Sequence, residues 1–274
     1  YLECHDINQN GIWDDGLDVV LVEIDDESFR LINEPMPYSR GSIWARTVRN
    51  LADAGASVIA IDMVFDKPDH QTANIKNYID SQNIENIEVK EGDDLLVEAV
   101  NYAASLGTKV IFSAVRKEET SRIPPDYLLE PTKELMNKNN NQKYGLVNIS
   151  TDSDGFYRKY GIYYPITGQG NYYTLGINTV LSYLGVEEKP EFSIDANSGI
   201  IQIGPIEIPF YGSMPNEFLL NYNGPASGEY KTFKRYPLSN IVDTEDYIVG
   251  EGEFNQDFGE MLYFEDQDWI DRII

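Results

Sequence analysis

The stretch "VRNLADAGASVIAIDMVF", Val48 to Phe65, decides the fold class. Its first part continues an apolar spacing of three to four residues that begins at Ile43, which predicts an amphipathic helix with Ser42 as its N-cap. Gly55 follows, a residue type that commonly ends helices. The remainder is a continuous apolar run, as in strands buried on both faces of a sheet. A helix that leads through glycine into a buried strand is a building unit of α/β proteins.

Segments on both sides of this stretch repeat the pattern. Val19 to Ile24 is another continuous apolar run, and "DDLLVEAVNYAASLG" predicts an amphipathic helix from an Asp94 cap to Gly107. "TKVIFSAV", residues 108–115, predicts a third strand. The polar segment from Lys67 to Gly92 is expected to be a loop or a variable insertion. Alternation of strands and helices predicts parallel strands joined by right-handed crossovers.

The second half of the chain changes character. "YGLVNISTDSDGFYRKYGIYYPI" is typical of two strands around an Asp-Gly turn, and "EFSIDANSGIIQIGPIEIPF" predicts a hairpin. A helix is expected in "YTLGINTVLSYLG" and a strand in "NEFLLNYNGP". The expected fold class is therefore α/β, with a mostly parallel central sheet flanked by helices in the N-terminal half. Antiparallel β-hairpins extend it in the C-terminal half.

The charge balance excludes some functions. The 274 residues carry 46 acidic and 21 basic side chains, a formal net charge of -25. Nucleic-acid binding needs a basic surface to neutralise phosphates, and this chain has none to offer. The balance fits an extracytoplasmic domain that stays soluble by charge and attracts cations.

Near the N-terminus, "DINQNGIWDDGLD" follows the order of a calcium-binding loop. Oxygen-bearing side chains fall at positions one, three, five and nine, a glycine occupies position six, and position seven offers a backbone carbonyl. Position twelve is Leu17 instead of a bidentate Glu, so another carboxylate must substitute. The expected ligands of a structural calcium ion are Asp6, Asn8, Asn10, Ile12, Asp14 and Asp18. The alternative is an Asx-rich turn without an ion.

Carboxylates also gather where the first two strands end, at Asp25 and Asp62. Ligands of open α/β sheets bind beyond the carboxyl ends of the strands, so a magnesium-dependent phosphoesterase is one interpretation. The other is structural: both carboxylates would cap helices or pair with a buried arginine, for which Arg40 is the obvious candidate.

Two further features allow a functional or a structural interpretation. "TDSDGFYR" could hold a cation through Asp152 and Asp154, although Asp-Gly usually makes a turn, with Arg158 as a cross-strand partner. A group of tyrosines between residues 157 and 173 could form a sugar-binding surface in a secreted carbohydrate-binding or carbohydrate-active protein. Alternating tyrosines are also ordinary sheet packing.

Six short sequence motifs, found in this order, indicate a protein family: "VEIDDESF", "PMPYSR", "VRNLADAGASVIAIDMVF", "GDDLLVEAV" followed by "KVIFSAV", "GLVNISTDSDGFYRKYGIYYP" and "LLNYNGP". Together they resemble the CHASE type 2 family of extracellular sensor domains, over roughly Val19 to Val242. That family usually has a tryptophan in a Pro-Trp-Pro-x-Arg motif, where this chain has Met36 and Tyr38. Its usual final strand is not visible before Ile274, so the sheet is expected to lack it.

The resemblance implies a ligand-sensing input domain, without catalysis of its own, on the extracytoplasmic side of a bacterial membrane. Flanking helices would anchor the receptor, and the output would be an adenylate or guanylate cyclase or a kinase. The signal, a small ligand or a cell-surface cue, stays unidentified, and a homodimer is possible. Matching positions are expected to be structural: Asp25, Arg40, Asp62, Asp154, Arg158, Asn221 and Gly224. The expected division is a calcium-loop segment (1–18), the sensor domain (19–242) and an acidic peripheral tail (243–274).

Overall fold

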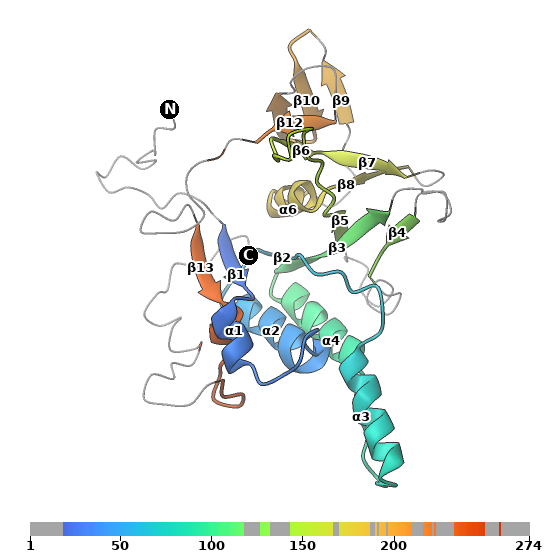
Figure 1. The fold of residues 1–274 in the computed structure, drawn as a ribbon. Coiled ribbons are helices and arrows are strands. Elements are labelled where there is room, and N and C mark those ends of the chain that lie inside the picture. The colour runs from blue at the N-terminus through green and yellow to red at the C-terminus, as the bar shows by residue number, and fades with distance from the viewer. Residues whose placement is uncertain are drawn as a thin grey trace, which may run out of the picture.

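The fold was analysed in a computed structural model, which describes residues 19–117, 127–131, 143–166, 170–186, 190, 192–195, 197–209, 216–220, 222, 233–249 and 258. Within these residues the protein is a mixed α/β structure with a mostly parallel central sheet, a separate parallel pair of strands and several smaller antiparallel sheets (Figure 1). The expected fold class is confirmed.

The central sheet is built around β3 (Lys109–Lys117). β2 (Val58–Ile61) and β5 (Lys143–Leu146) pair with it in parallel, and β4 (Tyr127–Leu129) pairs with its far end in antiparallel orientation. Ile111, Phe112 and Ala114 of β3 are fully buried, because helices cover both faces of the sheet.

Helices lie on both sides of this sheet. α2 and α4 cover one face and α6 covers the other (Figure 1). The larger core lies between the sheet and α2 and α4, around residues such as Val48, Leu51 and Leu96. The helices are α1 (Asp26–Leu31), the π-helix η1 (Arg40–Trp44), α2 (Ala45–Asp53), α3 (His70–Ser81), α4 (Gly92–Ser105), α6 (Leu175–Tyr183) and α7 (Leu238–Val242).

A separate parallel pair joins the two ends of the described chain. β1 (Val20–Glu23) is its first strand and β13 (Lys234–Pro237) its last, and they lie side by side in register. The predicted strand at Val19–Ile24 is thus confirmed, although only Val20 within β1 is fully buried.

Small antiparallel sheets make up the second half. β7 (Tyr163–Ile166) and β8 (Gly170–Tyr173) form one hairpin, and β6 (Lys159–Gly161) pairs with β12 (Glu217–Leu219). The predicted hairpin around residues 196–199 is confirmed as β9 and β10, and β11 extends it. The bounds of this sheet are β9 (Phe192–Asp195), β10 (Ile200–Ile203) and β11 (Ile206–Pro209).

Several local expectations were wrong. Ser39 and not Ser42 caps the helical run that begins at Arg40, and α4 begins at Gly92 with Glu91 and not Asp94 at its N-cap position. The segment from Lys67 to Gly92 contains α3, capped by the Asp69 carboxylate, and this helix extends away from the rest of the described fold (Figure 1). Its residues are mostly exposed, so no apolar stripe marked it in the sequence. The strands on either side of the Asp154 turn also do not form a hairpin, because β5 pairs with β3 and β6 pairs with β12.

Candidate functional site

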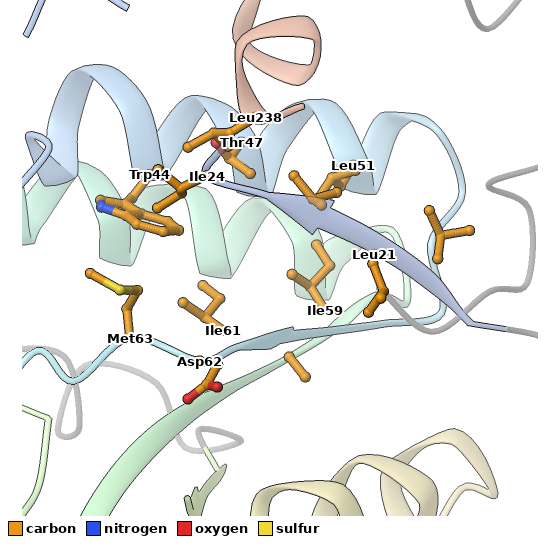
Figure 2. A pocket seen from close by; sticks show the side chains of 13 residues that line it. Leu21, Ile24, Trp44, Thr47, Leu51, Ile59, Ile61, Asp62, Met63 and Leu238 are labelled. Atoms are coloured by element: carbon orange, nitrogen blue, oxygen red, sulfur yellow. The ribbon is translucent and has the colours of Figure 1, made fainter. Parts of the chain in front are cut away.

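An apolar cavity of about 330 Å³ lies between β1 and β2 (Figure 2). Native interiors leave few voids larger than a water molecule, so a cavity of this size is a candidate binding site. It is lined by Val20, Leu21, Val22, Ile24, Trp44, Thr47, Leu51, Ile59, Ala60, Ile61, Asp62, Met63 and Leu238.

The cavity lies in the plane of the sheet. Successive side chains of a strand point to opposite faces, so a cavity above or below a sheet touches alternate residues only. Here Val20 to Val22 are consecutive in β1, and Ile59 to Met63 are consecutive along β2 and beyond its end. The cavity therefore lies against the edges of both strands.

These two edges lack a strand partner in the described part of the chain. β1 pairs there only with β13, and β2 pairs only with β3. Figure 2 shows that the two strands run in the same direction, from Leu21 to Ile24 and from Ile59 to Met63. The cavity thus separates two parallel half-sheets at the position where another strand would fit.

The walls of the cavity come from helices on one side. Trp44 and Thr47 belong to η1 and α2, and Leu238 comes from α7. Asp62 is the one charged residue of the lining, and its carboxylate points away from these helices (Figure 2). The walls therefore favour an apolar occupant, and the carboxylate disfavours an anionic one.

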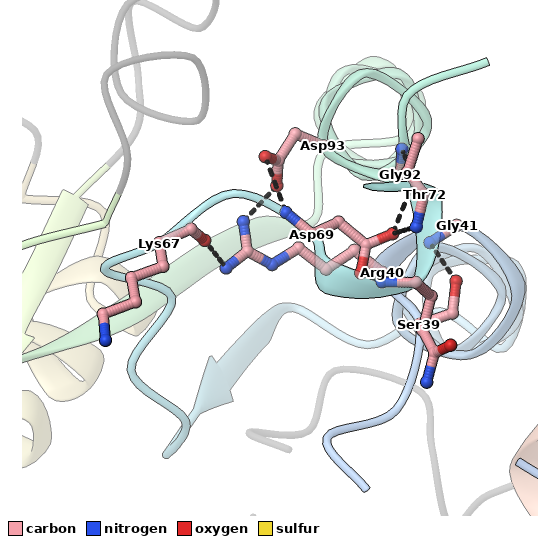
Figure 3. A network of polar contacts seen from close by, with 9 residues as sticks. Ser39, Arg40, Gly41, Lys67, Asp69, Thr72, Gly92 and Asp93 are labelled. Carbon is pink, nitrogen blue, oxygen red and sulfur yellow. Dashed lines mark hydrogen bonds and ion pairs between the residues drawn. The ribbon is translucent and has the colours of Figure 1, made fainter. Parts of the chain in front are cut away.

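A second feature is a buried polar network at the start of three helices (Figure 3). Arg40 donates from Nη1 to Oδ1 of Asp93 and from Nη2 to the carbonyl oxygen of Lys67. Its guanidinium carbon lies 4.7 Å from the centre of the Phe65 ring. Arg40 and Asp93 are 7% exposed each, so the ion pair is shielded from water. Such a pair needs further hydrogen bonds to offset its desolvation.

Those further bonds come from the segment ahead of α3. Oδ2 of Asp93 accepts from the backbone N–H of Asp69 at 3.3 Å. Asp69 in turn accepts from Oγ1 of Thr72 at 2.8 Å, and Thr72 Oγ1 accepts from the N–H of Gly92 at 2.9 Å. The network ties η1, α3 and α4 together through hydrogen bonds among its own members. Its role is structural.

Asp25 has one of its two expected structural roles, the helix cap, and neither Asp25 nor Asp62 pairs with Arg40. Asp25 caps α1, where its Oδ1 accepts from the N–H of Ser28 at 2.8 Å and from the Ser28 hydroxyl at 2.9 Å. Asp62 is exposed at the cavity rim. Arg40 pairs with Asp93 instead of either, because η1 directs its side chain toward the first turn of α4. The expected partners of Arg40 were wrong.

The "TDSDGFYR" segment is a turn held by an exposed arginine. Arg158 donates to both carboxylate oxygens of Asp154, at 2.8 and 2.7 Å, and to Asp152 at 3.0 Å. Gly155 has a φ of 84°, which only glycine adopts without strain. Hydrogen bonds from Arg158 and then from the N–H of Phe156 lower the pKa of Asp154 to about 2. The turn is therefore present, but Arg158 pairs with carboxylates of the turn itself and is not the cross-strand partner that the sequence predicted.

The tyrosines of the second half pack mainly against one another. Tyr163 lies opposite Tyr173 and Tyr164 opposite Tyr172 in the β7–β8 hairpin. The rings of Tyr144 and Tyr172 stack with centres 5.9 Å apart. Burial is the main cause that raises the pKa of Tyr164 and of Tyr173. For these tyrosines the arrangement is cross-strand packing, whereas Tyr157 of the same group is exposed.

Several predicted site residues lie outside the described residues. These are the calcium-loop positions Asp6, Asn8, Asn10, Ile12, Asp14 and Asp18, and the turn positions Asn221 and Gly224. Among the residues that the structure describes, no group of three or more His, Cys, Asp or Glu side chains could hold a metal ion. In the same part of the chain, no helix combines the length and the apolar character needed to cross a bilayer.

Sequence reasoning missed the importance of Asp93, Asp69 and Thr72. A signal existed for Asp93, since "EGDDLL" places two acidic residues in the first turn of a helix. That signal explains a helix start and does not reveal a distant arginine.

The described fold is a mixed α/β domain that combines an apolar cavity with a polar network whose role is structural. The cavity makes this domain a candidate for ligand binding. The CHASE2 domain family matches residues 5–268, nearly the whole chain, and the chain belongs to this family of extracellular sensory domains. The matched range also includes the calcium-loop segment and most of the acidic tail. No curated protein and no solved structure matches the chain.

Proposed function

We propose that this chain is the extracytoplasmic input domain of a bacterial transmembrane signalling receptor, and that it senses a ligand without catalysing a reaction. The observation that carries the proposal is the family match over residues 5–268. Family association favours a nucleotide cyclase as the output, ahead of histidine kinases and Ser/Thr kinases.

The topology supports a route for the signal. β1 and β13, the first and last strands of the described chain, form one parallel pair. In the proposed receptor, membrane helices would precede β1 and follow β13 in sequence, so both connections would start from this pair. The cavity lies between the pair and the rest of the central sheet. A ligand in the cavity would bind more tightly to one position of the β1–β13 pair, relative to the central sheet, than to another. It would thereby favour one arrangement of the membrane helices.

The receptor proposal is tested with the full-length parent in membrane vesicles. Val22→Cys with Ala60→Cys, joined by a bismaleimide, would fix the distance between β1 and β2, and cyclase output is expected to change severalfold and to stop responding to stimulus. A matched control joins Ser193→Cys to Glu207→Cys on β9 and β11, away from the cavity. A parent without hydrophobic helices before Tyr1 and after Ile274, or output that ignores the β1–β2 link, would refute the proposal.

We also propose that residues 6–18 bind a structural calcium ion through Asp6, Asn8, Asn10, the carbonyl of Ile12, Asp14 and Asp18. The order of oxygen ligands and the glycine at position six support this site. Since Leu17 occupies the twelfth position, affinity is expected to be modest, as in extracellular modules. In the receptor, calcium would stiffen the chain between the membrane and β1.

A further inference from the structure

Two segments that lie far apart in the sequence bring exposed aromatic residues together on the surface. Phe156 and Tyr157 follow the Asp154 turn and are 63% and 49% exposed, and Tyr222, shortly after β12, is 69% exposed. The segments meet where the hydroxyl of Tyr222 donates to the carbonyl oxygen of Tyr157. An aromatic side chain buries about 150–250 Å² in a core or an interface and thereby stabilises it. Three such side chains left in water at one place indicate a binding surface.

The pairing of β6 with β12 fixes this meeting point. Just beyond the last residue pair of the two strands, the backbone N–H of Leu220 donates to the carbonyl oxygen of Arg158 at 2.8 Å. Tyr157 and Tyr222 come next on their respective segments, on the side away from the paired strands. Their positions are therefore set by the backbone of a sheet and not by a free loop.

Polar contacts hold two of the rings without covering them. The guanidinium carbon of Arg158 lies 5.0 Å from the centre of the Phe156 ring, and Arg158 is itself held by Asp152 and Asp154. The hydroxyl of Tyr222 anchors its ring at one end. Rings that are positioned before a ligand arrives lose little conformational entropy when it binds.

The chemistry around the rings selects the class of ligand. Residues 150, 151 and 153 place exposed serine and threonine hydroxyls in the same segment, and the side chains of Asp154 and Arg158 are about half exposed. A pyranose sugar presents C–H groups to aromatic faces and hydroxyls to polar side chains, and in glucose-configured sugars the equatorial substituents leave C–H groups on both faces. The ionised groups beside the rings pair with one another, and the net charge of -25 repels an anionic sugar.

We propose that Phe156, Tyr157 and Tyr222 form a surface site for a neutral, glucose-configured oligosaccharide, which stacks on the rings and is hydrogen-bonded by polar side chains of residues 150–158. This site shares no residue with the cavity between β1 and β2. That such a sugar is the sensed signal rests on the proposed function, whereas the binding itself does not.

The probes are four neutral pentasaccharides: cellopentaose, laminaripentaose, maltopentaose and chitopentaose. A matched anionic probe is cellopentaose with its C6 hydroxymethyl groups oxidised to carboxylates. Calorimetry measures the dissociation constant, and amide chemical shifts of the isotope-labelled chain show where the probe binds. At least one neutral probe should bind saturably and shift the amides of residues 149–158 and 217–220, leaving those of Val20–Glu23 and Val58–Ile61 unchanged. The anionic probe should bind about tenfold more weakly than cellopentaose.

Substitutions in the site should weaken binding without unfolding the chain. Tyr157→Ala and Tyr222→Ala should each raise the dissociation constant by about tenfold, as truncation of an aromatic anchor does. Tyr222→Phe keeps the ring but loses the hydroxyl that fixes it, so the loss should be smaller. Tyr78→Ala is the matched control, because Tyr78 is 63% exposed on α3, and its binding should equal that of the wild type. All these side chains are exposed, so the melting temperatures should stay close to that of the wild type.

Three results would overturn the sugar site. These are the failure of all four neutral probes to bind at millimolar concentration, binding that survives Tyr157→Ala combined with Tyr222→Ala, and preference for the anionic probe. If the probes fail and the chain instead dimerises in sedimentation experiments until the same two substitutions are made, the aromatic surface contacts a second copy. Each result is measured on the isolated chain, so sugar binding can fail while the vesicle assay supports the receptor proposal, and the reverse.

Discussion

Arg40 and Asp93 form a buried ion pair although 53 positions separate them in the sequence. The pair joins the π-helix η1 to the first turn of α4, and the ring of Phe65 covers the guanidinium. Because each charge is removed from water, each depends on the other for its stabilisation.

Breaking this pair should be costly. Arg40→Met leaves the Asp93 carboxylate buried without its cation and should lower the free energy of unfolding by about 3–5 kcal/mol, measured by urea denaturation. Arg30→Met is the control, because Arg30 pairs with Glu27 on the surface, where such pairs contribute about 0–1 kcal/mol. Equal losses for the two variants would contradict the assignment.

The stability of Asp62→Asn and that of Asp93→Asn can be compared to test which carboxylate pairs with Arg40. If Asp62 were the partner of Arg40, Asp62→Asn would destabilise the fold as strongly as Asp93→Asn. Since Asp62 is exposed and Arg40 contacts Asp93, we expect Asp93→Asn to cost several kcal/mol and Asp62→Asn less than about 0.5 kcal/mol. Thermal and urea unfolding of the two variants side by side measure the difference. A large loss from Asp62→Asn alone would mean that the polar network is wrongly assigned.

Gly92 should not tolerate a side chain. A Cβ at this position would lie 2.0 Å from Oδ2 of Asp69, which hydrogen bonds to Thr72 hold in place. Alanine normally stabilises a helix relative to glycine by about 1 kcal/mol. Here we expect Gly92→Ala to destabilise by about 1–3 kcal/mol, the range for overpacking. In an Asp69→Ala background the obstructing carboxylate is gone, so the same substitution should cost less; an identical cost in both backgrounds would refute the clash.

The pKa of Asp154 should be measurable by NMR titration at about 2, because Arg158 and the N–H of Phe156 hydrogen-bond its ionised form. Arg158→Gln should return this pKa toward its ordinary value of 3.8. A lowered folded-state pKa contributes stability that is present above the ordinary value and is lost as the pH falls toward 2. The Arg158–Asp154 pair is exposed, so its effect on the free energy of unfolding should be small. An Asp154 carboxyl that titrates normally in the wild type would contradict the pairing.

If residues 6–18 bind calcium, the ion at millimolar concentration should raise the melting temperature of the chain. An ion that binds only the folded state stabilises that state. Asp6→Ala removes the first ligand and should erase the rise without changing the melting temperature in chelator. Magnesium serves as the control cation, since it demands a more regular octahedral site. An unchanged melting curve with calcium would reduce the segment to a turn.

Much of the fold could be predicted because local patterns specify it. The apolar runs that became β1, β2 and β3, the helix before Gly55 and the hairpin at residues 196–199 need only neighbouring residues to be recognised. α3 escaped recognition because it is mostly exposed and carries no apolar stripe. Residues beyond the predicted domain limit at Val242 also contribute to the larger core, where Val249 and Phe258 are buried.

The sequence by itself determined the fold class, the family and the positions of most strands and helices, since these depend on side-chain periodicity and on motifs within short segments. Only the tertiary structure decided that Arg40 pairs with Asp93, that Asp25 caps α1 and that β1 joins β13 across the length of the chain. It alone also revealed the gap between β1 and β2. The physical reason is that partners in ion pairs and sheet edges are chosen by proximity in space, and no spacing along the chain encodes that proximity.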